Sequence, residues 1–487
     1  MSQAVRELEP QSLWNHFSDL NAIPRASKKE ERVIAFMQDF GKELGLETLT
    51  DEVGNVIIRK PATPGMENRI PIVMQSHLDM VHQKNNDTNF DFDSEGIKMI
   101  VKDDWVKAEG TTLGADNGIG VASIMAILKS SDIPHPAIDA LFTIDEETGM
   151  TGALGLKGGL LNGKILLNLD TEDDDELTIG CAGGRDVTAS GKYSPQNCPS
   201  NSRSFKLTVS GLNGGHSGMD IHKGLGNANK IMNRLLWSGM ENSKIQVAEV
   251  DGGGLRNAIP RESVAVFVCN EDECSGMEKM IMRLANQIKA EHKSTDAELM
   301  IKLEKADTSE SVLPFAFQKQ LLGAIYSCPN GIYRMSPEID DLVQTSNNVA
   351  RVIIKEGTYT IMCLTRSSVD TEKDDIGAAI SGAFASLNAE IEYAGEYPGW
   401  APKPDAAIVK TMADIYEKRF NEKPHVMACH AGLECGILGT NYPEMEMISF
   451  GPNIRGAHSP DEKCQISSVQ KYWGFLLETL ENIPLAD

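Results

Sequence analysis

The chain has 487 residues, 41% of them hydrophobic, and a formal net charge of −24. This length predicts two domains, and the acidic charge argues against nucleic acid or a membrane surface as a partner. The first residues lack the apolar core of a signal peptide, and no stretch approaches the ~20 apolar residues of a membrane helix. Nine cysteines without a CxxC pair suggest reduced thiols, so we expect a cytoplasmic protein.

The first part of the chain is predicted to alternate helices and strands. We expect a helix from Ser27 to Leu44, then a hairpin that turns at Gly54-Asn55. Three apolar runs follow, at residues 69–79, 136–149 and 163–173, and apolar residues at helical spacing predict a helix within residues 114–130. This order predicts an α/β layered domain with a mixed, mainly parallel sheet.

Each of the three apolar runs ends in acidic or histidine side chains. His77 and Asp79 end the first run, residues 145–147 (Asp-Glu-Glu) end the second, and Asp170 ends the third. Residues i and i+2 of a strand project from the same face, so His77 and Asp79 would point together. Functional sites form at the carboxyl ends of strands in open α/β sheets, and we therefore expect a site at this edge.

The middle of the chain follows a different pattern. Segments between residues 204 and 305 predict the order β-α-β-β-α-β, which is the ferredoxin-like arrangement. A second, looser unit is predicted from Pro314 to about Glu396, and the sequence leaves open whether the two are duplicates. Helices and strands alternate again after Pro398. We therefore predict a catalytic domain formed by residues 1–184 and 399–487, with an inserted α+β domain at residues 185–398.

Five side chains are candidate metal ligands. Histidine nitrogen and carboxylate oxygen are the donors that zinc uses in hydrolases, and five ligands are too many for one tetrahedral site. They divide between two metals if one carboxylate bridges. Each residue taken singly has a simpler explanation, such as a helix N-cap for Asp116 or a solvated acidic loop for Asp170. The candidates are His77, Asp116, Glu147, Asp170 and His458.

The motifs that contain these residues resemble a known family. "HLDMV", "GADNGIG", "EETG", "LLNLD" and "GAHSPDE" are similar, in this order, to the ligand motifs of the aminoacylase-like di-zinc metallopeptidases. Longer strings, among them "GTTLGADNGIG", "GLNGGHSG", "RNAIPRE" and "HAGLECG", resemble the bacterial aminoacyl-histidine dipeptidases (peptidase D) over nearly the whole chain.

The resemblance assigns roles in the catalytic domain. It implies that Asp116 bridges two zinc ions, that the peptide bond after it is cis, and that a water or hydroxide lies between the metals. Asp79 would bond the far nitrogen of the histidine ligand. Glu146 would be the general base. One metal site would be completed by His77 and Asp170, and the other by Glu147 and His458.

The resemblance also assigns roles to the inserted domain, as a lid over the substrate and as the contact of a homodimer. His216 would donate to the developing oxyanion, with help from Asn257. Arg366 would bind the substrate carboxylate, and Gly432 would belong to a binding loop.

The expected function is the metal-dependent hydrolysis of unblocked dipeptides, preferentially Xaa-His such as carnosine. The expected cofactor is two Zn²⁺ per subunit, which Co²⁺ or Mn²⁺ can replace. One alternative is a related hydrolase of N-acyl amino acids or of peptide C-termini. Another is a non-catalytic protein that binds zinc or peptide, although Glu146 argues against it because binding alone does not require this residue.

Overall fold

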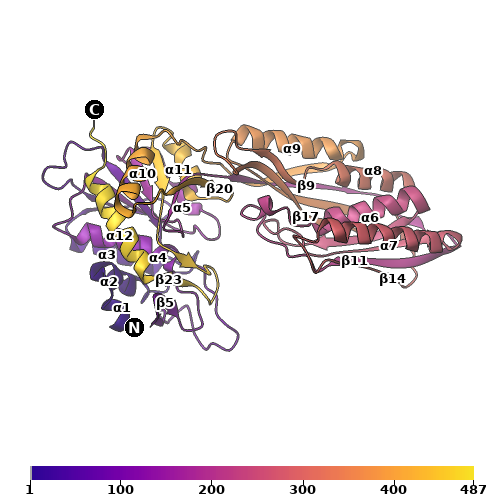
Figure 1. Ribbon diagram of the computed structural model, residues 1–487, viewed down its shortest axis with the longest axis horizontal. Helices are drawn as coiled ribbons and strands as arrows, with labels where there is room; N and C mark the ends of the chain where they lie inside the picture. The colour runs from indigo at the N-terminus through magenta and orange to yellow at the C-terminus, as the bar shows by residue number, and fades with distance from the viewer. Residues whose placement is uncertain (1–2, 487) are drawn as a thin grey trace. The chain divides into compact units, whose positions relative to one another are not determined.

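The structure, a computed structural model, describes residues 3–486 and divides into two compact units (Figure 1). Unit 1 comprises Met1–Cys181, Trp400–Ala428 and Leu433–Asp487, and unit 2 comprises Ala182–Gly399 and Cys429–Gly432. The chain thus passes between the units within three residues of the predicted boundaries at 184 and 398. It also returns briefly to unit 2 at 429–432, which the sequence pattern did not predict.

Unit 1 contains a mixed eight-stranded sheet. The central strands β6, β3, β7 and β21 pair in parallel, whereas β1 and β2 extend the sheet in antiparallel fashion beside β6. All residues of β3, β6 and β7 are buried, as expected for parallel strands covered on both faces. In sheet order the strands are β1 (Glu47–Thr50), β2 (Val56–Lys60), β6 (Ile138–Thr143), β3 (Ile72–His77), β7 (Ile165–Asn168), β21 (Glu446–Ser449), β8 (Glu176–Cys181) and β20 (His425–Cys429).

The helices of unit 1 include one that is almost wholly buried, α4 (Ala115–Lys129), which packs on β3 and α2. The predicted helix from Ser27 to Leu44 is α3, which begins only at Glu31 because Lys28 has a φ of +64°, outside the helical region. The others are α1 (Gln3–Arg6), α2 (Gln11–Leu20), α5 (Thr151–Gly155), α10 (Ala407–Phe420), α11 (Glu434–Asn441) and α12 (Ile466–Glu481). A small sheet adds β4 (Met99–Lys102), β5 (Trp105–Ala108), β22 (Ile454–Arg455) and β23 (Lys463–Gln465).

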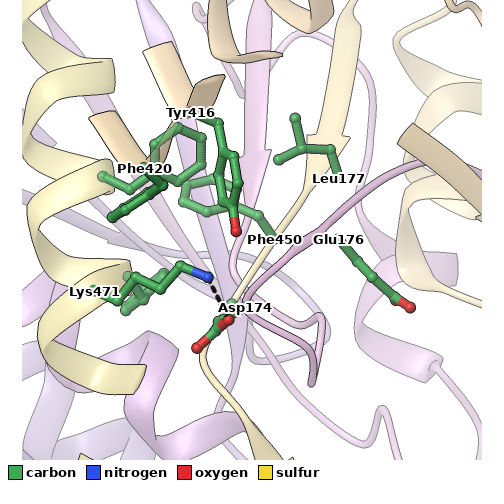
Figure 2. A pocket seen from close by; sticks show the side chains of 10 residues that line it. Asp174, Glu176, Leu177, Tyr416, Phe420, Phe450 and Lys471 are labelled. Atoms are coloured by element: carbon green, nitrogen blue, oxygen red, sulfur yellow. Dashed lines mark hydrogen bonds and ion pairs between the residues drawn. The ribbon is translucent and has the colours of Figure 1, made fainter. Parts of the chain in front are cut away.

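A partly buried lysine lies in the packing between α10 and α12. Figure 2 shows Lys471 extending past the rings of Tyr416 and Phe420 to reach Asp174. The ammonium lies 2.6 Å from the Asp174 carboxylate, so the charge is paired where solvent access is reduced. Among residues 3–486, no helix combines the length and the apolar character needed to cross a membrane.

Unit 2 contains a nine-stranded antiparallel sheet whose four long helices pack on one face (Figure 1). The first half is β11 (Ser202–Ser210), α6 (Ala228–Ser243), β12 (Gln246–Gly253), β13 (Ser263–Asn270), α7 (Cys274–Glu291) and β14 (Met300–Lys305). Its spatial order, β14-β11-β13-β12, is the predicted ferredoxin-like arrangement. The short strands β10 (Gln196–Asn197) and β15 (Ser311–Val312) form a separate ribbon.

The second half of unit 2 repeats this arrangement with a displaced first strand. Its elements are β9 (Gly183–Lys192), α8 (Phe315–Ser327), β17 (Val343–Lys355), β18 (Thr358–Ser367), α9 (Asp370–Phe384) and β19 (Glu390–Tyr397), with β16 (Gly331–Met335) added on β17. The order β17-β18-β9-β19 mirrors that of the first half. The sequence analysis predicted a second unit but left open whether it duplicates the first, and it did not assign β9 to it, because the whole first half separates β9 from the rest of its unit.

Candidate metal centre

Three parallel strands bring the predicted ligands of unit 1 to one edge of the sheet. His77 is the last residue of β3, Glu146 and Glu147 lie on the turn after β6, and Asp170 follows β7 by two residues. Because β3 pairs in parallel with both β6 and β7, the carboxyl ends of the three strands coincide.

Asp116 lies at the centre of the cluster, and its two carboxylate oxygens face different histidines. Oδ1 is 3.1 Å from Nε2 of His77, which is in turn 3.5 Å from Oδ1 of Asp170. Oδ2 is 3.2 Å from Nε2 of His458, which is 2.8 Å from Oε2 of Glu147. The five predicted ligands therefore form two groups of three that share Asp116. The peptide bond between Asp116 and Asn117 is cis, as the resemblance implied.

The carboxylates of the cluster attract positive charge, either a proton on a histidine or a cation that replaces it. Hydrogen bonds to Asp116 and Glu147 raise the pKa of His458 to about 11. Burial works against ionisation of Asp116, but hydrogen bonds from His458 and His77 hold its pKa below the ordinary value. Oε1 of Glu147 is buried without a hydrogen-bond partner. Imidazole nitrogens and carboxylate oxygens with a free donor atom fit two divalent ions such as Zn²⁺.

Asp79 connects His77 to the turn after β6. Its carboxylate Oδ1 is 3.4 Å from Nδ1 of His77, the nitrogen on the far side from Asp116, and its backbone oxygen is 3.1 Å from the same atom. The carboxylate also accepts the backbone N–H groups of Glu146 and Glu147 and the hydroxyl of Ser27, at 2.7 to 3.2 Å. One buried aspartate thus fixes both a histidine ring and the turn with the two glutamates.

The side chain of Glu146 differs from those of its neighbours because its carboxylate forms no hydrogen bond with the described residues. Burial raises its pKa well above the ordinary value, and the negative charges of Asp170, Glu434 and Glu147 raise it further, although His77 opposes them. A carboxylate whose pKa is raised holds a proton more readily than an ordinary one, which is the property needed to accept and return a proton.

Unit 2 brings together His216 and Arg366. Arg366 is 4% exposed, and its guanidinium contacts only neutral groups, namely Tyr397 Oη at 2.9 Å, His216 Nε2 at 3.4 Å and Ser217 Oγ at 3.5 Å. Among the described residues it forms no ion pair. Asp186, which pairs with Arg256, also interacts electrostatically with Arg366, but among the described residues no carboxylate lies within ion-pair distance of the guanidinium, which can therefore accept an anionic ligand.

The tautomer of His216 is determined by its neighbours. Nδ1 accepts the backbone N–H groups of Gly218 and Met219 at 3.2 and 3.0 Å. Burial and the adjacent Arg366 lower the pKa of His216 to about 4, so the ring is neutral at pH 7. Because Nδ1 accepts these two N–H groups, the proton of the neutral ring is assigned to Nε2, where it can be donated to a ligand; the 3.4 Å contact of Nε2 with Nη2 of Arg366, which can only donate, is then not a hydrogen bond.

The other two predicted substrate residues are placed less directly. Asn257 is exposed, and its backbone oxygen accepts the N–H of Ser217, so it supports the loop of His216 through the main chain. Gly432 closes the short segment Cys429–Gly432, in which His430 contacts Ser346 Oγ at 2.8 Å.

Sequence reasoning missed a buried polar network beneath the strand ends. Glu434, at the start of α11, accepts hydrogen bonds from Thr143 and Gln75 at 2.6 and 2.7 Å. Gln75 is two residues before His77, and Asn168, which also bonds Gln75, is two residues before Asp170. A polar residue at each of these otherwise apolar strand positions was the available signal. Burial raises the pKa of Glu434 to about 8.

Comparisons with known proteins identify the family of the chain. Residues 73–482 match the model of peptidase family M20/M25/M40. The chain is 41% identical over 480 residues to the cytosol non-specific dipeptidase of Escherichia coli, covering 99% of each chain. It is also 41% identical to the aminoacylhistidine dipeptidase of Vibrio alginolyticus, whose crystal structure matches with a TM-score of 0.93 over 99% of each chain. These matches confirm the resemblance to the aminoacyl-histidine dipeptidases, and the chain is a member of peptidase family M20/M25/M40.

Proposed function

We propose that this peptidase hydrolyses unblocked dipeptides at a centre of two divalent metal ions. The observation that carries the proposal is Asp116, whose two oxygens each face a separate histidine and carboxylate pair. A shared carboxylate of this kind is expected where two ions lie about 3.5–4 Å apart. The dipeptidase names of the two relatives at 41% identity support the substrate class.

In the proposed mechanism the metals are held by His77 and Asp170 on one side and by Glu147 and His458 on the other. Two divalent ions there would supply Lewis-acid chemistry, polarising the scissile carbonyl and acidifying water. Glu146 would accept a proton from the attacking water at a carboxylate oxygen and return it to the leaving amine. Burial raises the pKa of Glu146 above its ordinary value, which favours uptake of a proton by this carboxylate.

The substrate-binding proposal uses the cluster in unit 2. Arg366 would bind the terminal carboxylate of the dipeptide through its planar guanidinium, and the proton on His216 Nε2 would stabilise the developing oxyanion. The absence of an ion pair to Arg366 among the described residues, and the two N–H groups that Nδ1 of His216 accepts, support these roles. Asn257 and Gly432 would shape the same binding surface.

Further proposals concern specificity, metal and assembly. We propose Xaa-His dipeptides such as carnosine as preferred substrates and Zn²⁺ as the metal, because one relative is named an aminoacylhistidine dipeptidase and the donors are nitrogen and oxygen. The other relative is named non-specific, so we expect preference rather than exclusivity. Its cytosolic name supports action in the cytoplasm, and unit 2 is proposed as the contact of a homodimer.

A substrate panel tests the proposal. Metal-free protein and protein reloaded with Zn²⁺ are assayed on carnosine, Leu-His, Gly-Gly and N-acetyl-Leu-His. We expect cleavage of the free dipeptides only after metal is restored, fastest for the histidine-containing ones, and no cleavage of the acetylated peptide. Cleavage of N-acetyl-Leu-His would favour the alternative of a broader amidohydrolase. Metal binding without any hydrolysis would favour a binding protein.

A further inference from the structure

Glu462 follows the candidate ligand His458 by four residues and is 2% exposed. Its carboxylate accepts backbone N–H groups from four consecutive residues at the start of α4. Oε2 is 2.7 Å from the nitrogen of Leu113 and 3.0 Å from that of Gly114, whereas Oε1 is 2.7 Å from Ala115 and 3.3 Å from Asp116. These N–H groups precede the regular part of α4, since Asp116 and Asn117 have non-helical dihedral angles, and a carboxylate from a distant segment satisfies them.

Arg25 approaches the same segment from the other side and is completely buried. Nη2 donates to the backbone oxygen of Gly114 at 2.6 Å and to Oδ1 of Asn21 at 3.1 Å. Nη1 donates to the backbone oxygens of Leu78 and Asp79 at 2.9 and 3.1 Å. Burial lowers the pKa of Arg25 to about 10, so the guanidinium is still charged at neutral pH.

The two side chains meet at Gly114, whose N–H bonds Glu462 and whose oxygen bonds Arg25. Gly114 has a φ of +69°, and a Cβ there would lie 2.5 Å from Nη2 of Arg25. A Cβ on Gly118 would lie 2.8 Å from the same nitrogen. The glycines of "GADNG" therefore leave the space that the arginine occupies, and the opposite charges of two buried side chains interact there.

We propose that Arg25 and Glu462 are positioning residues that act together as a clamp on the metal centre. Arg25 holds residues 78–79, which follow His77. Arg25 and Glu462 together hold residues 113–116, which include Asp116. Glu462 also connects residues 113–116 to the segment that carries His458. Neither side chain is placed to contact a metal. The clamp therefore sets metal affinity by fixing the ligands, and this inference rests on the proposed metal-dependent function.

The test measures metal binding as well as activity. Metal-free Arg25→Gln, Glu462→Gln and the double variant are titrated with Co²⁺ against a chelating dye, and the visible spectrum of the loaded protein is recorded. The matched controls are Arg32→Gln and Asp461→Asn, which remove exposed charges next to the clamp segments. Circular dichroism verifies that each variant is folded at the assay temperature.

We expect each clamp variant to bind Co²⁺ about 10- to 100-fold more weakly, with an altered spectrum, whereas the controls match wild type. The fold-loss of Co²⁺ affinity in the double variant should be smaller than the product of the two single fold-losses, because both residues act on one segment. If a glutamine variant does not fold, Glu462→Asp keeps the charge on a shorter side chain and should still weaken binding.

Clamp variants that are less stable but bind Co²⁺ with wild-type affinity and spectrum would overturn the proposal and leave the proposed function intact. If the two single fold-losses of Co²⁺ affinity multiply to give that of the double variant, Arg25 and Glu462 do not act jointly. Failure of the wild-type protein to bind metal would overturn the proposed function and this inference together.

Discussion

Replacing Arg366 with methionine tests how the protein would recognise a dipeptide. Methionine keeps an unbranched apolar chain but removes the charge and the two-pronged donor. The side chain is 4% exposed, and without substrate it contacts only neutral groups of Tyr397, Ser217 and His216. The variant therefore leaves no buried carboxylate unpaired within unit 2, and its main loss is expected in the complex with substrate.

The magnitude follows from the bonds that the guanidinium would make. A hydrogen bond to a charged group contributes about 1.5–3 kcal/mol, and a guanidinium can form two parallel bonds to one carboxylate. A loss of about 3–5 kcal/mol corresponds to a fall in kcat/KM of about 100- to 5,000-fold. Arg366→Lys keeps the charge without the planar fork and should fall between wild type and Arg366→Met.

The assay compares Leu-His with its C-terminal amide in both enzymes. For the wild-type protein, kcat/KM should be lower on the amide than on the dipeptide, by about the same factor by which the substitution lowers kcat/KM on the dipeptide. The variant should have similar kcat/KM values on the two substrates. Equal losses for dipeptide and amide in Arg366→Met would refute the reasoning, since the arginine would then act on something other than the carboxylate.

Four further predictions concern catalysis and stability. Glu146→Gln should lower kcat by about 10²- to 10⁴-fold with unchanged metal content by elemental analysis, because a proton acceptor is lost but no ligand; unchanged kcat would exclude it as the base. Removing the metal with a chelator should lower the melting temperature, since a ligand at a thousandfold excess over its Kd adds about 4 kcal/mol to the native state; an unchanged melting temperature would argue against bound metal. Burial raises the pKa of Glu434 from its ordinary value of 4.5 to about 8. Between these two pH values the folded protein retains a proton that the unfolded chain has released. The free energy of unfolding therefore falls as the pH rises from about 4.5 to about 8. In urea unfolding of metal-free protein, the free energy of unfolding of Glu434→Gln should rise relative to wild type by up to about 5 kcal/mol between about pH 5 and pH 9. A difference between the two proteins that does not change with pH would contradict this. Asp174→Asn should lower the free energy of unfolding by about 1–3 kcal/mol, because it removes the counter-charge of Lys471 where solvent access is reduced. The control Asp405→Asn breaks an exposed ion pair and should change the free energy of unfolding little. Equal effects of the two substitutions would contradict this reasoning.

Several features of this fold could be read from local patterns. A strand that ends in a side chain such as His77 or Asp170 is visible as an apolar run with a polar terminus, since burial on both faces selects apolar residues throughout. The β-α-β-β-α-β order of residues 204–305 was equally visible, because each element of that half follows the previous one along the chain.

The repeat in unit 2 required the three-dimensional structure, because β9 pairs with β18 across the whole inserted first half. The brief return of residues 429–432 to unit 2 has no local signal for the same reason. Both features depend on pairing between distant segments, which a single sequence does not record.

The sequence by itself determined which residue types stand at the strand ends and in which order, and the family resemblance named them as metal ligands. Only the tertiary structure placed the two oxygens of Asp116 toward different histidines, and only it revealed Arg25, Glu434 and Glu462. A buried charged side chain has no periodic pattern of its own. Its partners are backbone and side-chain groups up to hundreds of residues away, and these come together only when the chain folds.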